Sequence, residues 1–99
     1  MTLHMIKLCV GTESIDDLAA WQKMQRTHTS AGGKACVYHT TFQFPKRQDD
    51  LLDGGSLYWV IKGIIQVRQR LVGFEQGTKE DGTPCCLILL DRALVPVRP

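Results

Sequence analysis

The stretch GGSLYWVIKGIIQVRQR, residues 54–70, decides how the middle of this chain folds. Lys62 and Gly63 separate two runs that are rich in β-branched and aromatic side chains, which favour strands. A glycine that can adopt positive φ is typical of a tight hairpin turn. The stretch therefore predicts a β-hairpin, preceded by a short helix that ends at Gly54 or Gly55.

One face of this hairpin combines arginines with an aromatic ring. Arg68 and Arg70 alternate with other residues in the second strand, so both guanidinium groups project from one face. A two-residue turn pairs Trp59 with Gln66 and places the indole ring on the arginine face, whereas a turn one residue longer places Tyr58 there. In either register an aromatic ring lies beside a guanidinium group. Such a surface can stack bases and pair with phosphates.

The rest of the chain predicts an α+β fold around the hairpin. The elements expected outside it are strands over residues 3–10, 35–44 and 85–90 and helices over about 15–27 and 46–55. Ser14 is the expected N-cap of the first helix, whose expected apolar stripe is Ile15, Leu18, Trp21 and Met24. The order β-α-β-α-β-β-β predicts one curved, mostly antiparallel sheet with residues 85–90 as a central strand. A half-open barrel is one form that such a sheet can take.

Length and composition indicate one small domain over residues 1–99. The net charge of +2 permits an anionic partner without requiring one. The sequence contains no apolar run long enough to span a membrane and no signal peptide, so we expect a protein of the cytoplasm. The four cysteines lack the spacing of a zinc site and are expected to be free thiols.

Catalytic chemistry has less support in the sequence than binding has. A sheet could bring His4, His39 and a cysteine together, but their spacing matches no metal or nucleophile motif. Asp49, Asp50 and Asp53 on the short helix could hold a hard cation or act as a base, although a solvated helix surface is favoured. The sequence therefore favours a non-enzymatic protein without catalytic residues, metal or cofactor, and a small enzyme that uses His39 and nearby acids is a third alternative.

Three segments carry a resemblance to a known family: MTLHMIKLCVG, FPKRQDDLLDGGSLYWVIKGIIQVRQRL and CLILLDRALVPVRP. Together they resemble a family of uncharacterised bacterial proteins, a domain of unknown function, and the most specific part is PKRxxxLLxGGSLYWVIKGxxxxRQR. The resemblance covers most of the chain and implies no activity. Because members usually continue further, it implies that the chain is truncated at Pro99. A second similarity, at the level of the fold, is to the small PUA-like barrels, several of which bind RNA or modified bases.

These observations predict a binding module for RNA or another anionic ligand. The expected contact residues are Lys46, Arg47, Tyr58, Trp59, Lys62, Arg68 and Arg70. Alternating arginines are equally typical of a solvated strand face, with both aromatic residues in the core. Another possible function is self-association or protein interaction, in which the exposed VPVRP segment and apolar strands pair with a second copy to form a homo-oligomer.

Overall fold

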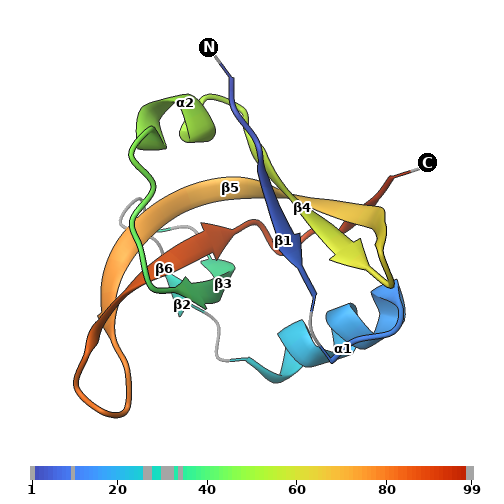
Figure 1. Ribbon diagram of the computed structural model, residues 1–99, viewed down its shortest axis with the longest axis horizontal. Helices are drawn as coiled ribbons and strands as arrows, with labels where there is room; N and C mark the ends of the chain where they lie inside the picture. Colours follow the sequence, from blue (N-terminus) through green and yellow to red (C-terminus); the bar gives the residue numbers. More distant parts are fainter. Residues whose placement is uncertain (1, 10, 26–27, 30–32, 34, 98–99) are drawn as a thin grey trace.

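The computed structural model describes residues 2–9, 11–25, 28–29, 33 and 35–97 (Figure 1). Its elements are β1 (Met5–Leu8), α1 (Ile15–Met24), β2 (His28–Thr29), β3 (Ala35–Thr41), α2 (Gln48–Leu52), β4 (Ser56–Ile61), β5 (Ile64–Thr78), β6 (Pro84–Leu90) and β7 (Val95–Pro96). The expected order of elements is confirmed, with the two-residue strands β2 and β7 added to it. Neither described helix has the length and apolar character needed to span a membrane.

The strands form one open sheet in the order β1-β4-β5-β6-β3-β2, and β7 pairs with β5. β1 and β4 run parallel, whereas the other described pairings are antiparallel. β5 is 15 residues long and arches across the molecule in Figure 1, pairing with β4 in its first half and with β6 in its second. The α+β class with a mostly antiparallel sheet is therefore confirmed, while the half-open barrel stays a prediction.

Two irregularities along β5 accompany its curvature. Gln66 is an extra residue opposite the step from Trp59 to Val60, and Val72 is an extra residue next to Gly73. A bulge of this kind bends its strand and increases the local twist.

The hydrophobic core lies on the face of the sheet that α1 covers. Leu18 of α1 packs in one cluster with Leu57, Trp59 and Ile88, all of them at most 2% exposed. β6 lies between β5 and β3, which confirms that residues 85–90 form a central strand. Cys85 and Cys86 are both buried in it, and all four cysteines are free thiols.

α1 differs from the expected helix in its length and in its buried face. Ser14 is the N-cap as predicted, with its hydroxyl accepting a hydrogen bond from the Asp17 N–H at 3.1 Å. The helix ends at Met24 rather than at residue 27, because the backbone of Gln25 is already extended. Three residues turn a helix about 60° short of a full turn, so a three-residue repeat drifts off the buried face. Met24 is accordingly 87% exposed, and Gln22 is buried with Leu18.

α2 is shorter than expected and ends in two glycines with different roles. Gly54 has φ +78° and forms the left-handed step after the helix. Gly55 is required for space, because a Cβ atom there would collide with the carbonyl oxygens of Leu3 and Leu51. The pair therefore lets β1, α2 and β4 approach one another closely.

Candidate functional site

The β4–β5 hairpin has the predicted two-residue turn, but its register differs from the prediction. Lys62 and Gly63 both have positive φ, 53° and 77°, as a type I′ turn requires. The extra residue Gln66 then shifts the pairing, so that Tyr58 lies opposite Arg68. The prediction that this turn places Trp59 on the arginine face is therefore wrong. Trp59 lies in the core and is 2% exposed.

The arginines lie on the side of β1, β4, β5 and β7 that faces away from the core, which we call the outer face. One row across these four strands contains Ile6, Tyr58, Arg68 and Val95. The next row, toward the hairpin turn, contains Leu8, Val60 and Ile65. Ile6 and Leu8 are 65% and 69% exposed. The outer face therefore combines two arginines with an exposed apolar strip.

The part of the outer face around Tyr58 is the portion of the predicted site that the structure brings together. The His4 ring meets the Tyr58 ring edge-on, with 5.4 Å between centroids and 82° between planes. His4 Nδ1 also accepts a hydrogen bond from the Ser56 N–H at 3.0 Å, which fixes the imidazole beside Tyr58. Arg68 and Arg70 are exposed, and among the described residues neither forms an ion pair.

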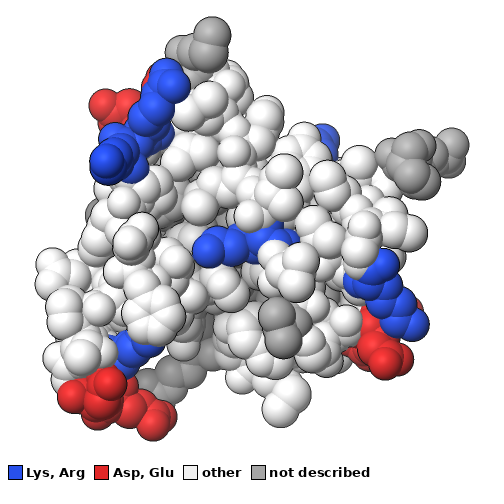
Figure 2. All heavy atoms as spheres, viewed as in Figure 1, with Lys and Arg blue, Asp and Glu red and all other residues white. Residues whose placement is uncertain are grey.

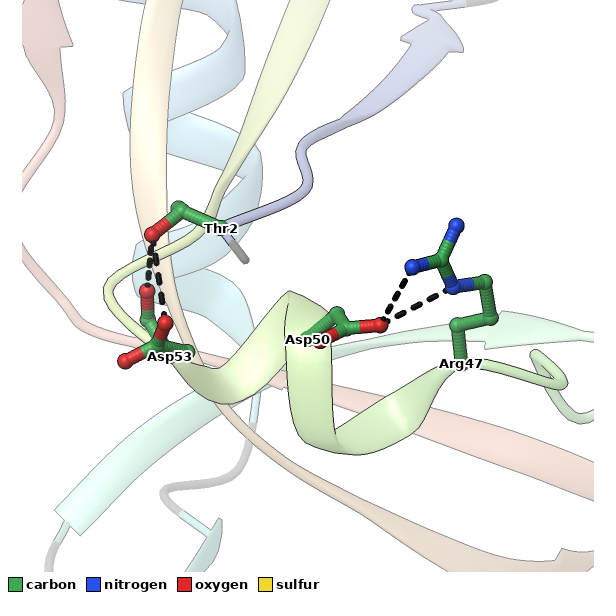
Figure 3. Close-up of polar contacts among 4 residues, drawn as sticks. All are labelled: Thr2, Arg47, Asp50 and Asp53. Atoms are coloured by element: carbon green, nitrogen blue, oxygen red, sulfur yellow. Dashed lines mark hydrogen bonds and ion pairs between the residues drawn. The ribbon is translucent and has the colours of Figure 1, made fainter.

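The remaining predicted basic residues lie elsewhere. Lys62 is in the hairpin turn, at the other end of β4 from α2 (Figure 1). Lys46 and Arg47 precede α2, where Figure 2 shows basic and acidic atoms side by side. Arg47 binds Asp50, with Nη2 2.8 Å and Nε 2.9 Å from Oδ2 (Figure 3), and this hydrogen bonding lowers the pKa of the Asp50 carboxyl group. Arg47 is therefore partly neutralised by its own helix.

His4 and His39 do not gather into one site. His4 packs on Tyr58, on the outer face of β4, whereas His39 packs on Trp59, on the core side of β4. Within the described part of the chain, no group of three or more His, Cys, Asp or Glu side chains is arranged to hold a metal ion.

A pocket of about 590 Å³ on the core side of β1 was not predicted from the sequence. Its lining includes Lys7, Cys9, Thr12, Trp21, His39 and Trp59. Lys7 lies opposite Trp59 in the parallel β1–β4 pair and therefore points to the core side of the sheet. The sequence does carry a signal for this site, because Lys7 is a charged residue in the apolar series of the first strand.

A buried network of glutamine side chains holds one wall of the pocket. The amides of Gln22 and Gln69 exchange two hydrogen bonds, of 2.8 and 2.9 Å. Gln69 Oε1 also accepts the Trp59 indole N–H at 2.8 Å, and Gln69 Nε2 donates to the Asp91 carbonyl at 2.9 Å. The network ties α1 to β4 and β5 and fixes the orientation of the Trp59 ring.

Comparison with known proteins gives a family but no activity. The family model described as "Protein of unknown function (DUF1489)" matches residues 5–99, nearly the whole chain. No curated protein and no solved structure matches the chain, so the similarity to PUA-like barrels gains no support. The expected resemblance to a domain of unknown function is confirmed, and the chain belongs to the DUF1489 family.

Proposed function

We propose that this protein is a non-enzymatic module that binds single-stranded nucleic acid, RNA in particular, through its outer face. The observation that carries the proposal is the cross-strand pair of Tyr58 and Arg68, with Arg70 two residues along the same strand. Sheet surfaces with an aromatic ring and adjacent basic groups stack unpaired bases and bind the phosphates between them.

The electrostatics of the outer face support the same function. Because Arg68 and Arg70 form no ion pair among the described residues, their charges remain available to a phosphate. Exposed Ile6 and Leu8 next to Tyr58 add apolar surface, against which a base can pack. Lys46 and Arg47 lie on a separate segment and Trp59 is buried, so we leave these residues out of the proposed contact surface.

The test is fluorescence anisotropy of a labelled single-stranded RNA, beside duplex RNA and single-stranded DNA. We expect binding that weakens between about 50 and 200 mM salt. Arg68→Ala/Arg70→Ala should weaken binding and lower the salt slope by about two. Tyr58→Leu should weaken single-strand binding at an unchanged slope, because base stacking carries no charge.

The matched control for the arginine pair is Lys23→Ala/Lys79→Ala. It also removes two positive charges, one from α1 and one from the β5–β6 turn. It should retain the affinity and most of the salt slope. If the two double variants lose affinity equally, binding depends on net charge alone and the outer face is not the site.

The exposed apolar strip of the outer face favours a second candidate function, self-association. It includes Ile6, Leu8, Ile65 and Val95, each at least 37% exposed. The VPVRP segment is less available for this purpose than expected, since Val95 and Pro96 already pair with β5 of the same chain.

Sedimentation across a concentration series tests self-association. A mass that rises with concentration, resists salt and is lost in Ile6→Ser/Leu8→Ser would support an outer-face dimer. A constant monomer mass would contradict self-association. Contact with nucleic acid would then be the function of the apolar strip.

A further inference from the structure

The pocket on the core side of β1 lies where this edge strand of the open sheet approaches β3, the strand next to the other edge. Lys7 of β1 approaches Thr41 of β3, with 3.5 Å between Nζ and Oγ1, although no described strand pairing joins these two strands. The volume of about 590 Å³ falls in the range of small-molecule sites, about 300–1,000 Å³.

Two indole rings are among the groups that line the pocket. Trp21 and Trp59 are the two tryptophans of the chain, and both line the pocket. Trp59 is fixed by its hydrogen bond to Gln69 and by the edge-on contact with His39, with 5.2 Å between ring centroids. Trp21 is 46% exposed, so its ring remains available for contact. A planar ligand would meet a wall that is already ordered, which lowers the cost of binding.

Lys7 supplies a positive charge to the pocket. It is half-buried, and among the described residues it forms no ion pair. Burial and the charge of Lys7 lower the pKa of His39, which favours the neutral form of this imidazole. In Figure 2 a band of basic atoms crosses the centre of a largely uncharged face, over β1. A half-buried ammonium group among aromatic rings gains most from an anion that enters with the ligand.

We infer that this pocket binds a planar aromatic ligand that carries one anionic group, a carboxylate or a phosphate, close to Lys7. The ring lies against Trp21, the more exposed of the two indoles, with Trp59 beside it, and the anion pairs with the Lys7 ammonium group. This site is distinct from the outer face, because Lys7 and Trp59 point to the opposite side of β1 and β4 from Ile6 and Tyr58.

The test is titration of the ¹⁵N-labelled protein, followed through its two indole N–H signals. The probes are adenosine 5′-monophosphate and indole-3-carboxylate, each beside its uncharged counterpart, adenosine and indole-3-carboxamide. We expect both indole signals to shift and at least one anion to bind about tenfold more tightly than its counterpart. The two anions distinguish a nucleotide phosphate from an aromatic carboxylate.

Variants of Lys7 separate charge from shape. Lys7→Met keeps the apolar stem and should reduce the preference for the anion to about one, whereas Lys7→Arg should retain it. Lys46→Met, a charge-matched control before α2, should bind like the unaltered protein.

Two results would overturn the inference, and both are obtained with the unaltered protein. One is that none of the four probes shifts either indole signal at millimolar concentration; the other is equal affinity for the anions and their counterparts. RNA binding that depends on Arg68 and Arg70 is unaffected by either result, so the two proposals fail separately.

Discussion

Gln69 is the side chain on which α1, β4 and β5 converge, and it is fully buried. Its amide group forms hydrogen bonds with three groups at the same time: the Gln22 amide, the Trp59 indole N–H and the Asp91 carbonyl. A strand pattern places position 69 on the inward face, because it alternates with Arg68 and Arg70. It cannot predict the partners, which come from three distant parts of the chain.

Replacing Gln69 should cost much more than its apolar surroundings suggest. Gln69→Leu leaves the Trp59 indole N–H and the Gln22 amide buried without partners, at about 1–3 kcal/mol for each unsatisfied group. We therefore expect a loss on the order of 3 kcal/mol in the free energy of unfolding, measured by urea titration followed by circular dichroism. Gln76→Leu, at an exposed position of β5, is the control. Equal losses for the two variants would show that the network contributes nothing.

His39 should make stability depend on pH in the weakly acidic range. Its pKa is lowered in the folded protein by burial and by Lys7, whereas the unfolded chain keeps the ordinary value of about 6.5. The stabilisation is fully present above that value and is lost as pH falls through the lower folded pKa. The midpoint of urea unfolding should therefore fall more between about pH 7.5 and about pH 5.5 in the unaltered protein than in His39→Phe. This variant keeps an aromatic ring against Trp59. An equal fall in both would assign the pH dependence to other groups.

The elements were predictable from the sequence to a greater extent than their register. The composition of the two runs and the Lys62-Gly63 step were enough to predict the hairpin, and its turn is confirmed. The bulge at Gln66 was not predictable, because its side chain closes the irregularity by donating to the Ile61 carbonyl at 2.8 Å, a contact without a local sequence pattern. One extra residue decided that Tyr58, and not Trp59, lies beside Arg68.

The junction of β1, α2 and β4 should tolerate no side chain at Gly55. A methyl group there meets backbone carbonyls of Leu3 and Leu51, which cannot move independently of their elements. We expect Gly55→Ala to destabilise the protein by about 3 kcal/mol or more, measured by thermal unfolding. Gly82→Ala, at φ +86° with open space around it, should cost only about 1 kcal/mol. Similar losses would mean that the junction relaxes around the methyl group.

At the scale of the whole molecule, the apolar run of residues 85–90 predicted a central strand, but nothing local predicted the partner of β1. Met5–Leu8 pairs in parallel with residues 57–60, about half the chain away. The pocket depends on this pairing and on the approach of β1 to β3. It was therefore outside the reach of pattern reasoning, although each of its residues is visible in the sequence.

Stability should be distributed unevenly over the sheet. β6 has strands on both sides and Ile88 and Leu90 are fully buried, whereas β1 has one partner strand and exposes Ile6 and Leu8. Native-state hydrogen exchange should therefore show the β6 amides exchanging last, at the free energy of global unfolding, and the β1 amides exchanging earlier through local opening. Simultaneous exchange of both strands would indicate one cooperative unit.

The parallel pairing of β1 with β4 also bears on the order in which the chain folds as it is synthesised. β4, β5 and β6 are neighbours both in sequence and in the sheet, so their contacts close short loops and are expected to form first. β1 leaves the ribosome before all of them but has no partner until β4 has followed, which takes several seconds at about 5–20 residues per second. During that interval Ile6 and Leu8 belong to an unpaired apolar segment, the kind of nascent sequence that chaperones bind.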